Sequence, residues 1–454
     1  MRKNDLLTLP ITGYTHDGAG VGRTKEGYVL FVPRTAAGDL AQVRVVKVGR
    51  SFGYGRLEAL IDPSPDRLPP PPDCPAFPRC GGCAYRHINY TAELAAKRRQ
   101  VEAALAKALP DPPPVADVVP SPEIDRYRNK IALPVGLQGG HAVTGYYRLH
   151  SHDIVPCEDC LLQPREVSAA AQALCAHIDR HGISVYDERT HSGLVRSLFV
   201  RAGQGAGQYM AAVVVNGQTL PAAQGLTEAL RAALPGLVSL QLNHHTARTN
   251  LLLGARSTLL FGQDKVEDLL LGIRHRISLH SFYQINRLQC EALYRCAIRL
   301  AGLTGAERVL DLYCGIGTIG LSMAPHCAEV LGVELLPQAV LDAAEGARQN
   351  GLHNARFLCA DAAQAARQLA DEGFAPDVVV LDPPRKGCDR ALLQTVAGMA
   401  PGRIVYISCN PATLARDLAV LLELGYRAGE AQPFDLFPRT AHVECVTLMS
   451  RVEK

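Results

Sequence analysis

The 454-residue sequence has no apolar run of the roughly 18 to 20 residues that a membrane-spanning helix needs. Its first ten residues, MRKNDLLTLP, also lack the apolar core of a secretion signal. The chain has little excess charge, because a formal net charge of +3 is only mildly basic. These absences argue against a membrane partner and favour the cytoplasm, and composition by itself predicts no nucleic-acid partner.

Cysteine, by contrast, is abundant, with 14 residues. In a small secreted chain this number would suggest disulfides, but in a long chain without an export signal we interpret them as reduced thiols. A surface for nucleic acid would have to come from a local cluster of basic residues, such as Arg126, Arg128 and Lys130. The alternative for such a cluster is an ordinary solvated face.

The length of the chain predicts two to four domains. Residues 5–61 contain short β-rich runs separated by glycine-containing turns, which is typical of a small antiparallel barrel, so the first domain spans 1–62. The proline-rich segment IDPSPDRLPPPPD then interrupts any helix or central strand, because proline has no amide donor. Residues 91–108 have a helical composition and are expected to pack on the C-terminal domain. They belong to a mixed α+β region that we take as the second domain, 63–280.

From about residue 281, apolar strands alternate with helical stretches. The strands are predicted in the segments RVLDLYC, EVLGVEL, ARFLCAD, DVVVLDPP and RIVYISC. Such alternation predicts a parallel sheet with helices on both faces. The fold class is therefore α/β, and the third domain spans 281–454.

Candidate cofactor-binding residues lie at the carboxyl ends of these strands, where ligands bind in open α/β sheets. The first strand ends in a glycine turn, and Glu334, Asp361 and Asp382 end or follow the next three strands. A carboxylate such as Glu334 can accept hydrogen bonds from both ribose hydroxyls, which suits a nucleoside-containing cofactor. GIGTIG at 315–320 would also fit a dinucleotide. DPPR at 382–385, however, resembles the fourth motif of class I methyltransferases.

Cys409, in Ile-Ser-Cys-Asn-Pro at 407–411, lies just beyond the fifth strand and is a candidate nucleophile. A thiolate there could add to C6 of a uracil and make C5 nucleophilic enough to accept a methyl group. The C5 proton must then leave, and Glu444 in His-Val-Glu-Cys-Val at 442–446 is our choice of base. The alternatives are a buried structural cysteine and a surface carboxylate. Arg385 stands where enzymes that methylate exocyclic amines typically carry an aromatic residue, which disfavours that reaction.

An ordered series of motifs resembles the RNA uridine-5 methyltransferase family, and within it the iron–sulfur-containing branch that acts on 23S ribosomal RNA. The resemblance spans nearly the whole chain. It rests on the barrel at 5–61, which looks like a TRAM domain, on Cys74-x5-Cys80-Gly-Gly-Cys83, on Ser281-Phe-Tyr-Gln-Ile-Asn286, and on DLYCGIGT, DPPRKG, SCNP and HVEC.

The resemblance implies a fold, an activity and a set of site residues. The expected architecture is an N-terminal OB-like TRAM barrel, a central α+β domain carrying a metal cluster, and a C-terminal class I, Rossmann-like methyltransferase domain. The expected activity is S-adenosylmethionine-dependent methylation of a uridine C5 in 23S ribosomal RNA by a monomeric enzyme, through an adduct of Cys409 with Glu444 as the base. The implied cofactor contacts are Gln284, Tyr313, Thr318, Glu334, Asp361 and Asp382. Thr318 departs from the family pattern, since many relatives carry asparagine there.

The resemblance also assigns Cys74, Cys80, Cys83 and a distant fourth cysteine to a [4Fe–4S] cluster. Spacing alone fits a zinc site equally well, since both need clustered thiolates. Cys157 and Cys160 are both candidates for the fourth ligand, and we choose Cys160 because the family's ligand directly precedes a Leu-Leu-type segment.

Two other functions remain open at this point. A uridine-5 methyltransferase for transfer RNA would need the same catalytic residues. A non-catalytic RNA-binding iron–sulfur protein would not need them, and the presence of Cys409 and Glu444 argues against it.

Overall fold

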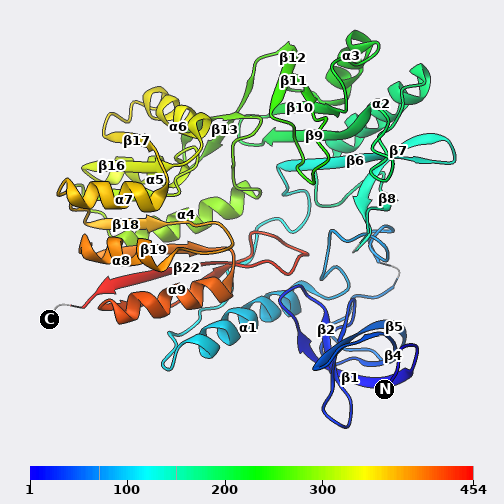
Figure 1. The fold of residues 1–454 in the computed structure, drawn as a ribbon, viewed down its shortest axis with the longest axis horizontal. Coiled ribbons are helices and arrows are strands. Elements are labelled where there is room, and N and C mark those ends of the chain that lie inside the picture. The colour runs from blue at the N-terminus through cyan, green and yellow to red at the C-terminus, as the bar shows by residue number, and fades with distance from the viewer. Residues whose placement is uncertain (71, 150, 453–454) are drawn as a thin grey trace.

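The computed structural model describes residues 1–70, 72–149 and 151–452. Its first five strands close into a barrel, drawn in blue in Figure 1. The strands are β1 (Leu6–Tyr14), β2 (Gly20–Arg23), β3 (Val29–Val32), β4 (Leu40–Val48) and β5 (Phe52–Asp62), in the order β1-β2-β3-β5-β4. Alternate side chains such as Leu9, Ile11, Val43 and Val45 are buried inside the barrel. This alternation with a period of two is what the β-rich runs predicted.

Helix α1 (Tyr90–Ala108) connects the barrel region to the rest of the molecule. It begins at Asn89, whose side chain accepts a hydrogen bond from the Ala92 amide at 2.8 Å. Val101 and Leu105 are buried against the C-terminal sheet and its helix α9 (Pro411–Glu423). By its packing, α1 is part of the C-terminal layer.

The central region is built on a seven-stranded sheet, drawn in cyan to green in Figure 1. Its elements are β6 (Lys130–Gln138), β7 (His141–Tyr147), β8 (Ile154–Pro156), α2 (Arg165–His181), β9 (Val195–Gly203), β10 (Gln208–Val215), α3 (Ala223–Ala233), β11 (Leu237–His244) and β12 (Arg256–Gly262). One face of the sheet packs against α2 and α3. The other face, with Phe199 and Met210, shares a continuous core with the hairpin of β13 (Lys265–Leu270) and β14 (Ile273–Ser278) and with the C-terminal sheet. One hydrophobic core therefore contains residues from both sides of position 280, where the second expected domain ends. The three domain boundaries remain predictions.

The C-terminal region is a sheet covered by helices on both faces, as expected for the α/β class. Its elements are α4 (Arg287–Ala301), β15 (Arg308–Leu312), α5 (Thr318–Met323), the 3₁₀ turn Ala324–His326, β16 (Glu329–Glu334), α6 (Pro337–Gln349), β17 (Ala355–Cys359), α7 (Ala362–Asp371), β18 (Val378–Leu381), α8 (Arg390–Gly398), β19 (Arg403–Ser408), α9, β20 (Tyr426–Ala428), β21 (Gln432–Phe434) and β22 (Glu444–Arg451). The strand order is β17-β16-β15-β18-β19-β22-β20, with β21 also paired to β22. The five predicted strands run parallel, whereas β22 is antiparallel to β19.

Alternate residues along these strands point to two separate cores. Helices α4, α5 and α6 contribute to the core on one face, and α1, α7, α8 and α9 to the core on the other. None of the helices in the described residues is both long enough and apolar enough to cross a membrane.

A buried group of charges ties α1 to the β21–β22 loop, residues 435–443. The Lys97 ammonium lies 2.7 Å from Glu93 and 2.6 Å from Asp435, and all three side chains are fully buried. Tyr90 donates a hydrogen bond to the other Asp435 oxygen at 2.8 Å. The Arg439 amide donates to Glu93 at 2.7 Å. The position of the loop therefore depends on a lysine that has no access to water.

Replacing Lys97 tests this dependence. Lys97→Met should lower the free energy of unfolding by about 3–5 kcal/mol, because it leaves the buried Asp435 carboxylate without a cation and Glu93 with only the Arg439 guanidinium, 3.6 Å away. Arg98→Met is the control on the same helix, since the Arg98 side chain is 40% exposed and its ion pair with Glu102 is worth about 0–1 kcal/mol. Urea denaturation measures both changes. Equal losses for the two variants would contradict the role given to Lys97.

Candidate active site

A cavity of about 650 Å³ lies at the carboxyl edge of the C-terminal sheet. It is bounded by the ends of several strands and by the loops that follow them, which is where an α/β sheet binds its ligand. Seven of the residues expected at the site line this cavity. They are Gln284, Tyr313, Glu334, Asp361, Asp382, Cys409 and Glu444.

One half of the cavity carries polar groups held by backbone hydrogen bonds. The Glu334 carboxylate accepts from the Gly315 amide at 3.2 Å and from the Leu336 amide at 2.8 Å. Asp361 uses one oxygen to cap α7, accepting from the Ala363 amide at 3.0 Å, so its second oxygen is available to a ligand. Gly315 has a φ of 58°, a backbone conformation that favours glycine. This half can bind a nucleoside.

Thr318 is placed differently from the expectation. It does not line the cavity, and its hydroxyl lies 2.8 Å from the Tyr294 hydroxyl inside the core. This arrangement gives no support to the direct cofactor contact expected of Thr318, which stays a prediction. The reason is that α5 begins at Thr318, which turns the side chain back towards α4.

The other half of the cavity brings Cys409 and Glu444 together through strand register. In the antiparallel pair of β19 and β22, Ser408 lies opposite Cys445. One step further along the register, Cys409 lies opposite Glu444. The two residues are 35 positions apart in the sequence, and only the reversed direction of β22 makes them neighbours.

Burial and neighbouring charges determine the protonation of this pair. Burial raises the pKa of the Cys409 thiol to about 12, and the Glu444 and Asp382 carboxylates add to this effect. Arg385 acts in the opposite direction on the same thiol. Burial also raises the pKa of Glu444 well above its usual range and that of Asp382 to about 7. A positive charge bound beside these groups would favour their ionised forms.

The cavity is also lined by residues that were not expected at this site from the sequence, namely Lys130, Phe282, Phe437 and His442. The Lys130 ammonium lies 5.6 Å from the centre of the Phe282 ring, and Phe282 is 58% exposed. The Arg385 guanidinium lies 3.2 Å from His442 Nε2. The Ser281–Asn286 motif could have indicated Phe282, whereas nothing in the sequence placed Lys130 here.

Arg126, Arg128 and Lys130, which were expected to form one basic RNA-binding surface, do not lie together on one patch. The Arg126 guanidinium donates to Asp159 at 2.6 Å and to the Cys160 carbonyl at 3.0 Å. Arg128 lines a different pocket, and Lys130 lines the cavity. The three side chains diverge because buried Tyr127 and Asn129 hold the chain between them.

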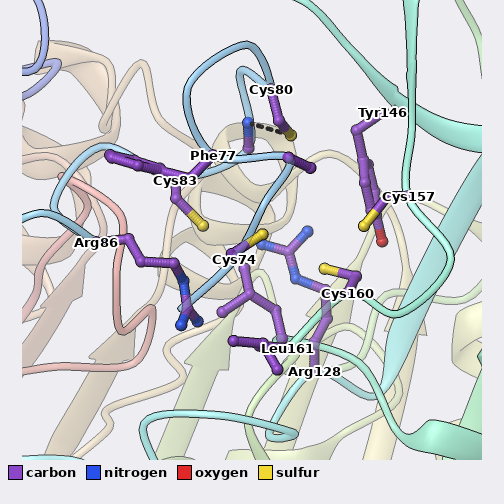
Figure 2. A pocket seen from close by; sticks show the side chains of 13 residues that line it. Cys74, Phe77, Cys80, Cys83, Arg86, Arg128, Tyr146, Cys157, Cys160 and Leu161 are labelled. Atoms are coloured by element: carbon purple, nitrogen blue, oxygen red, sulfur yellow. Dashed lines mark hydrogen bonds between the residues drawn. The ribbon is translucent and has the colours of Figure 1, made fainter. Parts of the chain in front are cut away.

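Five cysteines surround a second, small pocket, and Figure 2 shows their sulfur atoms pointing into a common space. Cys74, Cys80 and Cys83 lie on the loop after the barrel, and Cys157 and Cys160 lie on the loop after β8. The first loop packs closely on β7, since a Cβ on Gly81 would lie 3.1 Å from the Tyr147 carbonyl oxygen. Glycine at this position lets the first loop lie against the end of β7.

The thiols of this pocket are not equivalent. The Cys157 thiol lies beside both Cys74 and Cys160, and by donating its one hydrogen to either sulfur it lowers the pKa of that thiol. Burial raises the pKa of Cys83 to about 12. Among the described residues, no group of three or more Cys, His, Asp or Glu side chains is arranged to hold a metal ion. The sulfurs thus line one space without converging on a single point.

The layered sheet, with a cavity at the carboxyl ends of its strands, is the architecture of a Rossmann-like α/β methyltransferase. Residues 226–452 match the tRNA (uracil-5-)-methyltransferase family model, and residues 4–57 match the TRAM domain. The chain belongs to this uracil-5 RNA methyltransferase family, and its similarity to curated RNA methyltransferases extends over almost its whole length.

Those relatives and one solved structure match over almost the whole chain. An uncharacterized RNA methyltransferase of Halalkalibacterium halodurans is 40% identical over 99% of this chain and 98% of its own length. One from Bacillus cereus is 41% identical over 100% of this chain and 98% of its own. The crystal structure of Pyrococcus abyssi tRNA (uracil-54, C5)-methyltransferase in complex with S-adenosyl-L-homocysteine has a TM-score of 0.79 and 27% identity, covering 97% of this chain and 99% of that one.

The charges around Cys409 predict opposite effects of two substitutions on its alkylation. Asp382→Asn removes a negative charge, so the pKa of the Cys409 thiol falls and iodoacetamide should react faster at fixed pH. Arg385→Gln removes a positive charge, so that pKa rises and the reaction should slow. Each change should be at most about tenfold, since one pKa unit is a factor of ten in thiolate. Mass spectrometry of the Cys409 peptide measures the rates, with exposed Cys359 as the internal control. Changes of the same sign would refute this electrostatic account.

Proposed function

We propose that this protein methylates C5 of a uridine in 23S ribosomal RNA, with Cys409 as a covalent nucleophile and Glu444 as the base. The observation that carries the proposal is the register that sets Cys409 opposite Glu444 at the rim of the methyl-donor cavity. A uracil needs both groups in one place, because C5 becomes nucleophilic only after addition at C6.

Each residue has a defined part in this reaction. The Cys409 thiolate forms a bond to C6, and the electron pair of the C5–C6 double bond moves onto the ring as an enolate. S-adenosylmethionine supplies an electrophilic methyl group, which C5 then accepts. The Glu444 carboxylate takes the C5 proton, the double bond re-forms, and the C6–S bond breaks to return the thiolate. Arg385, which favours the thiolate, assists the first step.

The polar half of the cavity would hold the methyl donor. We assign the ribose hydroxyls to Glu334, whose two oxygens are already oriented by backbone amides. Asp361 would bind through the oxygen that does not cap α7, as an acceptor for the adenine amino group. Gln284, Tyr313 and Asp382 line the same space and complete the proposed set.

Transfer RNA is the second candidate substrate. The observation in its favour is the likeness to the Pyrococcus abyssi enzyme, which is a tRNA (uracil-54, C5)-methyltransferase. The barrel does not discriminate, because that structure matches 97% of this chain. The cysteine motif supports ribosomal RNA through its resemblance to the iron–sulfur branch. Mapping 5-methyluridine in both RNAs from cells with and without the gene decides between the two.

The two catalytic residues should fail differently when they are replaced. Cys409→Ala should abolish methyl transfer and give no covalent complex, because nothing can add to C6. Glu444→Gln keeps the thiol, so the methylated adduct should accumulate for lack of a base. On a denaturing gel with radiolabelled substrate RNA, only Glu444→Gln should show a slow protein–RNA band that requires S-adenosylmethionine.

Two results would contradict this mechanism. A fully active Cys409→Ala enzyme would exclude covalent catalysis, and normal turnover of Glu444→Gln would remove that residue as the base. Cys445→Ala is a matched control, since Cys445 is the next residue on β22 but is buried away from the cavity.

We propose that the cysteine pocket holds a [4Fe–4S] cluster. The donor set fits, because the pocket presents thiols and no carboxylate, and the Arg86 and Arg128 guanidinium groups can balance negative charge. Sulfurs that stand apart around a space suit a cubane, in which each thiolate binds a different iron, better than a single zinc ion. Cys74, Cys80, Cys83 and Cys160 would be the ligands, and the cluster would join the two cysteine-bearing loops that line the pocket.

Metal analysis tests the cluster and its fourth ligand. The purified protein should be brown and contain roughly four irons per chain. Cys160→Ser should lose the iron, whereas Cys157→Ser, the matched control three residues away, should retain it. Stoichiometric zinc without iron would refute the cluster, and iron loss only in Cys157→Ser would reverse the ligand assignment.

A further inference from the structure

One of the five cysteines in the small pocket has no place in the proposed cluster. A cubane binds one thiolate at each of its irons, and the other four cysteines of the pocket are assigned to them. Cys157 nevertheless points its sulfur into the same space, as Figure 2 shows, and its thiol lies beside both Cys74 and Cys160. The side chain is half-buried, so a small oxidant can reach it. Cys157 is therefore available to react with one of these two neighbours.

Hydrogen bonds to the central region hold the segment from Cys157 to Cys160. The Cys157 amide donates to the Thr144 carbonyl on β7 at 3.1 Å. The Arg126 guanidinium donates to the Cys160 carbonyl at 3.0 Å and to the carboxylate of Asp159, which lies between the two cysteines, at 2.7 Å. None of these contacts involves the first cysteine loop. The segment therefore keeps both of its thiols in the pocket whether or not a cluster joins the two loops.

We propose that Cys157 is a resolving thiol for Cys160, and that the two form a disulfide, reducible by a dithiol, when peroxide removes the cluster. The inference rests on the proposed cluster, because it takes Cys160 as a ligand that is released when the iron leaves. The Cys-x-x-Cys spacing allows two sulfurs of one loop to bond to each other. Cys74 is the less suitable partner, since it lies on the first loop, whose link to this segment the cluster would supply.

The reaction takes two electrons from the two thiols, and hydrogen peroxide accepts them. The Cys160 sulfur attacks one peroxide oxygen, the O–O bond breaks, and the other oxygen leaves as water with the thiol proton, so that Cys160 becomes a sulfenic acid. The Cys157 sulfur then attacks the Cys160 sulfur, the S–O bond breaks, and a second water leaves. A sulfenic acid without a resolving thiol can react with more peroxide to a sulfinic acid, which dithiols do not reduce. Cys157 thus keeps Cys160 able to bind iron again.

Peroxide treatment of the iron-loaded, full-length protein tests this role. In the wild type, the tryptic peptide 149–165, which carries both cysteines, should become lighter by two hydrogens as the iron is lost. Dithiothreitol, ferrous iron and sulfide should then restore the cluster. Cys157→Ser should regain several-fold less iron, because its Cys160 is oxidised to the sulfinic acid. Cys175→Ser is the matched control and should behave like the wild type, since Cys175 is also half-buried but lies on α2, outside the pocket.

Two outcomes overturn the proposal. One is a wild-type protein in which Cys157 stays reduced, or is joined to Cys74, after the iron is lost. The other is a Cys157→Ser protein that regains as much iron as the wild type. Metal analysis before the peroxide step separates these results from failure of the proposed cluster. Zinc in place of iron rejects the cluster, and the mass of peptide 149–165 after peroxide then still shows whether Cys157 joins Cys160.

Discussion

The antiparallel direction of one strand, β22, is the constraint on which the site depends. In a parallel sheet the strands all end at the same edge, so a following strand of the same direction would begin at the opposite edge. Because β22 runs backwards against β19, its first residue, Glu444, begins where the others end. The loop before β22 must then cross the rim of the cavity, where Phe437 and His442 line the wall. Buried Lys97 holds this loop from the side of α1.

The cysteine-bearing segment is joined to the same loop by main-chain hydrogen bonds. The amides of Ala84 and Tyr85, which follow Cys83, donate to the Arg439 carbonyl at 2.8 and 3.1 Å. The Tyr127 hydroxyl donates to the Pro438 carbonyl at 3.0 Å. The loop that carries the rim of the cavity is thus held by α1, by the cysteine loop and by the start of the central sheet. Distant parts of the sequence meet at this loop because its backbone carbonyls find hydrogen-bond donors on other segments.

Sequence reasoning succeeded where a local pattern was enough. The five parallel strands were predicted because buried strands appear as short apolar runs, and α1 was predicted from composition and flanking prolines. Seven of the expected site residues meet in one cavity because the ends of parallel strands share an edge. Thr318 lies outside the lining of that cavity, because the start of α5 directs its side chain towards α4. Arg126, Arg128 and Lys130 failed as a surface because their neighbours, not their spacing, determine where each side chain goes.

The sequence by itself determined the fold class and the family and predicted the chemistry-bearing residues, since each depends on local periodicity or on an ordered set of motifs. Only the tertiary structure decided that Cys409 faces Glu444, that Lys130 belongs to the cavity, and that both Cys157 and Cys160 face the cysteine pocket. These are relations between residues far apart in the chain. They are set by strand direction and by which faces pack together, and no local pattern of apolar and polar residues encodes either.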